Sequence, residues 1–170
     1  AMPEASEITK FLKSNNYSAN AKLKALRAIS THLYMSAQQF KNVALCFPEG
    51  VDRQDVFCLL HTRVVDPANL LGPMTLYAPA IFSEADRMAL FRRIGHLHLL
   101  NPLHPDHIPY LCRLAVYEER RVVELLVLLT MHEAGGRVLR HVAGSVGVVP
   151  ASWVGKGVPC EDMVLDVTYE

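Results

Sequence analysis

The sequence lacks the cysteine spacing of a zinc knuckle or a redox site. No two of its cysteines stand in a C-x-x-C arrangement, which excludes both motifs. The cysteines are Cys46, Cys58, Cys112 and Cys160. Most of them sit inside apolar stretches, so we interpret them as free, buried thiols in a reducing compartment. We therefore expect an intracellular, cytoplasmic chain.

Long apolar runs and an excess of charge are also missing. The longest apolar run, Val122 to Met131, is interrupted by Glu124 and is too short to span a bilayer. Basic and acidic residues balance at 17 each. Proteins that mainly grip nucleic acid or anionic membranes usually carry a net basic surface, although a balanced chain can still hold a local basic patch. We predict no nucleic-acid partner and no membrane insertion.

Sequence motifs of catalysis are absent as well. There is no serine elbow, phosphate-binding loop, H-E-x-x-H or Rossmann glycine pattern, and glycine is scarce in the helical part. We predict no enzyme activity and no cofactor. One constellation leaves an alternative open, because four histidines fall in a short window and imidazoles can share a metal. These weak metal candidates are His96, His98, His104 and His107.

That histidine window contains prolines, so its other interpretation is an exposed loop between helices, without a metal. A second pair, Cys58 and His61, lies one helical turn apart and would suit a thiol–imidazole nucleophile. Cys58 also neighbours the predicted core residue Phe57. We favour a buried structural cysteine over a nucleophile.

The chain does contain clear signals of helices. It has 170 residues and 51% hydrophobic content, enough for a domain with a sizeable core. Ser36 and Gln39 have the spacing of a capping box. Asp66-Pro67 and Asn101-Pro102 each read as a helix cap followed by proline in the first turn. Between these signals the apolar residues have helical spacing.

Similar side chains recur at fixed offsets. Steps of 34 residues join Arg53 with Arg87 and Arg121, and Phe57 with Phe91 and Leu125. An earlier unit fits at an offset of 31, with Leu26 matching Phe57. We predict four helix–turn–helix units over about 6–33, 36–65, 67–100 and 102–134. The alternative is a row of antiparallel helices with short loops and no true repetition.

The last helical segment and the tail differ from the rest. Residues 118–133 are apolar nearly all round, which predicts the centre of the domain or part of an interface. Leu165, Val167 and Tyr169 alternate with polar residues, as in a strand. A lone strand needs a partner. Three interpretations of the tail strand are open. It is an artefact of truncation, it packs on the last helix, or it pairs with a strand of another chain.

The predicted fold class is therefore all-α. We expect an array of about four antiparallel helical hairpins resembling an α-solenoid, followed by a short extended tail. The predicted domains are a helical-hairpin domain at residues 1–143 and an extended tail at residues 144–170. The alternative for residues 144–170 is the start of a following segment.

Part of the chain resembles a known family. Residues 46–53, with Phe47 before a short turn and a charged helix start, precede an aliphatic helix that ends in Val65-Asp66-Pro67-Ala68-Asn69. This pattern resembles the family catalogued as domain of unknown function 4476, over about residues 8–100. Arg53 stands where the family usually has lysine. The resemblance implies a helical-hairpin fold and no catalytic residues.

Equivalent arginines in a stacked array would line up on one surface. Guanidinium groups bind carboxylates in pairs, so such a ladder suits an acidic peptide. The candidate partner-binding residues are Arg53, Arg87, Arg92, Arg93, Arg121, Trp153 and Tyr169. The alternative is ordinary solvated helix faces, neutralised by neighbours such as Asp52 and Asp86.

These observations favour a protein–protein interaction module or scaffold domain within a larger protein. The expected partner is a protein or a peptide, and an acidic one would suit the arginines. The alternatives are a structural homo-oligomer formed through the last helix and tail, and a metal-dependent enzyme centred on residues 96–107.

Overall fold

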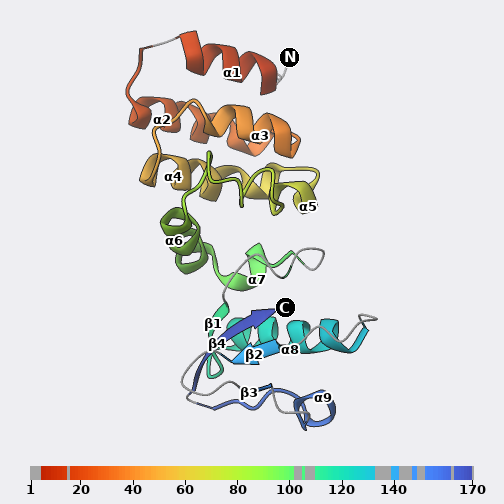
Figure 1. Ribbon diagram of the computed structural model, residues 1–170. Helices are drawn as coiled ribbons and strands as arrows, with labels where there is room; N and C mark the ends of the chain where they lie inside the picture. The colour runs from red at the N-terminus through yellow and green to blue at the C-terminus, as the bar shows by residue number, and fades with distance from the viewer. Residues whose placement is uncertain are drawn as a thin grey trace. The chain divides into compact units, whose positions relative to one another are not determined.

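The computed structural model describes residues 5–14, 16–101, 105, 110–132, 139–141, 147–148, 152–161 and 163–169 (Figure 1). The chain divides into two compact units, Ala1–Ile94 and Gly95–Glu170, and each is described by itself. This division differs from the expected boundary at residue 143, which lies inside the second unit.

The first unit is a stack of helices in two rows. Its helices are α1 (Ala5–Ser14), α2 (Ala19–Ile29), α3 (Ala37–Ala44), α4 (Val51–Leu60), α5 (Pro67–Leu70) and α6 (Glu84–Ile94). Helix α3 packs against α1 and α5, and helix α4 packs against α2 and α6. Figure 1 shows the resulting progression from α1 to α6. Such stacking lets each helix bury its apolar face on the equivalent helix of the next hairpin.

The offset of 31 residues corresponds to a repeated local structure. Helices α2 and α4 each run into a 3₁₀ turn, Ser30–His32 and His61–Arg63. An extended residue follows each turn, with ψ of 135° at Leu33 and 126° at Val64. The backbone of Met35 joins the two repeats: its N–H donates to the Arg63 carbonyl at 3.1 Å and its carbonyl accepts from the Val65 N–H at 3.0 Å.

Of the predicted helix caps, the one at Ser36 is present in the structure. Ser36 Oγ accepts from the Gln39 N–H, and Gln39 Oε1 accepts from the Ser36 N–H, so the predicted capping box is confirmed. Asp66 precedes Pro67 at the start of α5 as expected, but its carboxylate caps no backbone N–H of that helix, and Oδ2 accepts from the Asn69 side-chain amide at 3.0 Å. Asp66 Oδ1 instead accepts from the Ala37 N–H at 2.7 Å, which ties the start of α5 to the start of α3.

Three phenylalanines lie at the centre of the first unit. The Phe57 ring meets those of Phe40 and Phe82 edge to face, both at 5.6 Å between centroids. His61 stacks on the same ring at 5.7 Å. Phe40, Phe57 and Phe82 are fully buried, so α3, α4 and the chain before α6 share one core.

The second unit combines helices with a sheet. Its elements are α7 (His96–Leu99), β1 (Tyr110–Arg113), α8 (Tyr117–His132), β2 (Leu139–His141), β3 (Gly147–Val148), α9 (Ser152–Lys156) and β4 (Val164–Tyr169). The strands form one sheet in the order β1-β4-β2-β3, and every pair is antiparallel. Helix α8 packs against β1, β2, α7 and α9.

Strand β4 confirms the alternation predicted for the tail. Leu165, Val167 and Tyr169 are buried, and Val164 is exposed. The strand pairs with β1 on one side and β2 on the other, all within this chain. Both backbone edges of β4 are therefore paired within this chain.

The chain is mostly helical, as predicted, but the fourth expected hairpin is absent from the described residues. Where residues 102–134 were expected to hold two helices, β1 precedes α8. Tyr110 and Cys112 are buried while Leu111 and Arg113 are exposed. Four residues of alternation are too few to stand out against the neighbouring helical spacing. None of the described helices has the length and apolar character needed to cross a membrane.

Candidate functional site

Arg53 is a structural residue at the start of α4. Its side chain is buried; Nε donates to the Phe47 carbonyl at 3.0 Å, and Nη1 donates to the carbonyls of Ala80 and Ile81 at 3.2 and 3.0 Å. Glu49, on the solvent side, lies 3.6 Å from Nη1. The guanidinium thus binds the turn before α4 to the chain before α6, and it is not displayed to a partner.

Arginines near the start of three helices bind the preceding loop, but in the third helix the residue is Arg120 and not Arg121, which the 34-residue step predicted. Arg87 Nη1 donates to the Phe82 carbonyl at 2.9 Å, and Arg120 Nη1 donates to the Leu114 carbonyl at 2.8 Å. Each arginine, like Arg53, lies in the first turn of its helix and binds a carbonyl five or six residues earlier. These bonds satisfy carbonyls that the preceding loop leaves without a helical donor. These arginines therefore hold the loop that precedes each helix against the start of that helix.

The remaining partner-binding candidates are scattered. Arg93 pairs with Asp55 at 2.6 Å and Arg121 with Glu124 at 2.7 Å. Arg92 is exposed, Trp153 is half-buried and Tyr169 is buried. Arg53, Arg87, Arg92 and Arg93 belong to the first unit, and the others to the second. Neither unit brings its members together into one exposed cluster, and their role in binding stays a prediction.

Only part of the histidine window can be evaluated. On α7, His96 is buried and His98 is exposed, whereas His104 and His107 lie outside the described residues. The described side chains contain no group of three or more potential metal ligands.

The thiol–imidazole pair has the wrong geometry and chemistry for a nucleophile. Nδ1 of His61 lies 3.2 Å from the carbonyl oxygens of Phe57 and Cys58. Burial raises the pKa of the Cys58 thiol. A raised pKa disfavours the thiolate, which is the reactive form. Cys58 is partly buried, whereas the sequence predicted a buried cysteine; of the four thiols Cys112 is buried, Cys46 is partly buried and Cys160 is exposed.

His96 makes the second unit sensitive to acid. Burial lowers its pKa, Glu119 raises it and Arg113 lowers it further. The folded chain thus binds the proton more weakly than the unfolded chain. This contribution to stability is complete above the unfolded pKa of about 6.5 and is lost as the pH falls. We expect the free energy of unfolding of the unit to decrease between pH 7 and pH 5.

Urea unfolding at several pH values, followed by circular dichroism, measures this dependence. A His96→Gln variant should have a shallower slope because glutamine does not titrate. The exposed His98→Gln is the matched control and should keep the parental slope. Glu119 does not contribute to the slope between pH 7 and pH 5, because its hydrogen bond with Arg113 holds the pKa of its carboxyl below the ordinary value. Equal slopes for the two variants would contradict the assignment.

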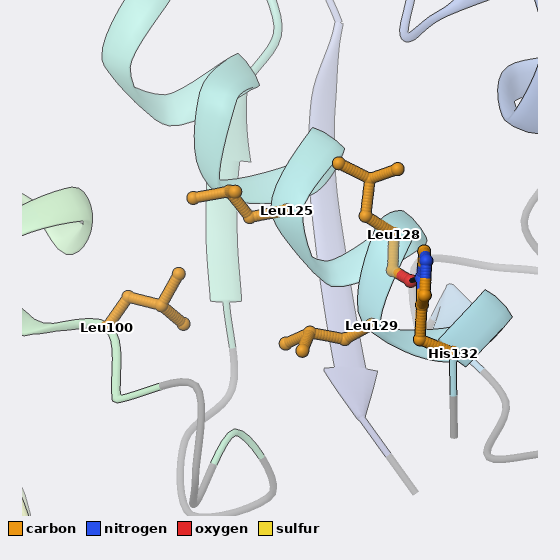
Figure 2. Close-up of a pocket in the computed structure, with 5 residues that line it drawn as sticks. All are labelled: Leu100, Leu125, Leu128, Leu129 and His132. Atoms are coloured by element: carbon orange, nitrogen blue, oxygen red, sulfur yellow. Dashed lines mark hydrogen bonds between the residues drawn. The ribbon is translucent and has the colours of Figure 1, made fainter. Parts of the chain in front are cut away.

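One apolar pocket lies on the outer face of α8. It has a volume of about 160 Å³ and is lined by Leu100, Leu125, Leu128, Leu129 and His132 (Figure 2). In Figure 2 the lining residues of α8 project from one side of the helix, with spacing i, i+3, i+4 and i+7, and Leu100 faces them. Val122, Val123, Leu126 and Val127, on the other side, are buried. Helix α8 is thus both core and surface, which explains its nearly continuous apolar sequence.

A larger apolar groove lies between α1 and α2. Its volume is about 340 Å³, and its floor is made by Ile8, Leu12 and Leu26, which are 5%, 1% and 1% exposed. The Phe11 side chain stands at the rim, 50% exposed, with its ring 6.5 Å from that of Tyr17. The remaining lining residues are Glu7, Ala25 and Ile29. Buried apolar side chains at the floor and an exposed aromatic ring at the rim are typical of a docking groove.

The groove is lined by residues of α1 and α2. Helix α1 packs against α3, and helix α2 packs against α4. The sequence signal was the spacing of Ile8, Phe11 and Leu12, which sequence analysis did not single out.

Comparison of the chain with protein-family models, with curated proteins and with solved structures finds no match. The resemblance to domain of unknown function 4476 therefore stays a prediction.

Proposed function

We propose that this chain is a protein–protein interaction module that holds a helix of another protein in the groove between α1 and α2. The observation that carries the proposal is the half-exposed Phe11 above a floor of buried aliphatic side chains. Helices that dock in grooves present apolar anchors at positions i, i+3, i+4 and i+7. A lining in which Glu7 is the one ionisable side chain suits such anchors better than it suits a polar substrate.

The size of the groove also suits a docked helix. A cavity of about 150 Å³ holds one benzene ring, so about 340 Å³ leaves room for about two anchor side chains. The anchors would contact Phe11 on one wall and Ile29 on the other. Because the floor is buried before binding, little rearrangement of the stack is needed, which keeps the cost of ordering low.

The test is selection of peptides on the full chain, followed by truncation of Phe11. A display library of amphipathic helices, about four turns long, provides the probes. For selected peptides we expect Phe11→Ala to raise the dissociation constant at least tenfold, as loss of an aromatic anchor usually does. Fluorescence anisotropy with labelled peptides measures it. Phe11 is half-exposed, so the variant should remain folded, which thermal unfolding checks.

Leu128→Ala is the matched control. Leu128 is 43% exposed and lines the pocket on α8, so the same kind of truncation is made on the second unit. We expect it to leave peptide binding unchanged. If the selected peptides lose affinity in Leu128→Ala and not in Phe11→Ala, the groove is not the binding site. A dimer by light scattering that Leu128→Ala dissociates would favour the alternative of a homo-oligomer formed through α8.

A further inference from the structure

The segment that forms the groove is strongly basic, although the chain as a whole carries no net charge. Between Glu7 and Glu49 the sequence contains no aspartate or glutamate. The same stretch holds Lys10, Lys13, Lys22, Lys24, Arg27 and Lys41. The balancing carboxylates thus lie elsewhere in the chain, and a charge asymmetry of this kind is typical of an interaction surface.

Two lysines lie beside the groove. Lys10 follows Glu7, a lining residue, by three positions, so the two are neighbours on the surface of α1, and Lys10 is exposed. Lys22 precedes Ala25 and Leu26 by three and four residues, so it lies on the face of α2 that lines the groove. In the described part of the chain, no ion pair joins any of these lysines to a carboxylate.

We propose that the partner of this groove is an acidic amphipathic helix, with apolar anchors in the groove and carboxylates on its flanks facing Lys10 and Lys22. This inference rests on the proposed function and adds the charge of the partner. Rim charges of complementary sign set partner choice and association rate, while the apolar anchors provide the affinity. A nucleic acid fits less well, because the aliphatic floor of Ile8, Leu12 and Leu26 offers neither hydrogen bonds nor stacking surfaces.

The charge of the selected peptides tests the inference. The helix library should carry Asp, Glu, Lys and Arg with equal frequency at its flanking positions, and selection should use the full chain. Among peptides whose binding depends on Phe11, we expect acidic residues to exceed basic ones at least threefold. Basic or neutral Phe11-dependent peptides would overturn the inference and leave the proposed function standing. If no peptide depends on Phe11, both proposals are wrong.

Charge reversal at the rim provides a second test. For one selected acidic peptide, we expect Lys22→Glu to weaken binding about fivefold, measured by fluorescence anisotropy, as expected for one rim charge. A peptide with one flanking glutamate changed to lysine should recover part of that loss. Lys156→Glu, which makes the same change at an exposed position of α9, should have no effect.

Salt and nucleic acid complete the experiment. Raising the ionic strength from about 0.05 M to 0.5 M should raise the dissociation constant of the acidic peptide several-fold, because salt screens exposed charges. Equal effects of Lys22→Glu and Lys156→Glu would overturn the inference. It is also wrong if a single-stranded oligonucleotide of the same net charge displaces the peptide at equal concentration.

Discussion

Replacing Arg53 with methionine is expected to lower the free energy of unfolding of the first unit by about 3 kcal/mol or more. The guanidinium is the donor to three backbone carbonyls, those of Phe47, Ala80 and Ile81. Methionine fills similar space but donates no hydrogen bond, so partly buried carbonyls would lose their partners. Urea unfolding at neutral pH, followed by circular dichroism, measures the loss.

Arg92→Met is the matched control for this prediction. Arg92 is exposed on α6, so its replacement should change stability by no more than about 0.5 kcal/mol. Arg53→Lys should fall between the two, because an ammonium group cannot reproduce the fork of donors that binds separated carbonyls. If Arg53→Met is as stable as Arg92→Met, the bonds of the guanidinium do not hold the loops, and a surface role for Arg53 is open again.

The second large effect is expected from Val167→Asp, which should prevent folding of the second unit. Val167 is fully buried in β4, where it is opposite Tyr110 of β1 and His141 of β2. An unpaired carboxylate at this position costs several kcal/mol, which is comparable to the whole stability of a small unit. Hydrogen exchange read by mass spectrometry should show loss of protection across α8, β1 and β4.

Val164→Asp provides the control on the same strand. Val164 is 52% exposed, so its carboxylate remains in water and the pattern of protection should be retained. Loss of the sheet also uncovers the buried face of α8, so Val167→Asp is expected to aggregate on concentration and Val164→Asp is not. A folded, protected Val167→Asp would mean that β4 is not the centre of this sheet.

Features that depend on nearby residues were predictable from the sequence. The capping box at Ser36 is a bond between residues three apart, and therefore any chain with this spacing can form it. The strand at β4 followed from alternation over Leu165, Val167 and Tyr169. The 31-residue offset identified matching helices because the same apolar spacing packs the same way in consecutive hairpins.

The candidate site was predictable only in part. The spacing of Ile8, Phe11 and Leu12 marks an apolar face on α1, but sequence does not say whether another helix covers it. The answer depends on which other helices pack against α1 in the folded chain. Likewise, the run of residues 8–48 without carboxylates is visible in the sequence, and its meaning depends on which lysines lie beside the groove.

By itself, the sequence determined that this chain is mostly helical, that its second and fourth helices match, and that its tail forms a strand. Only the tertiary structure decided what these elements contact. It paired β4 with β1, more than fifty positions away along the chain, and turned the arginines Arg53 and Arg87 inward onto loop carbonyls. The reason is physical: caps and periodicity depend on neighbouring residues, whereas strand partners and exposed faces depend on segments that folding brings together.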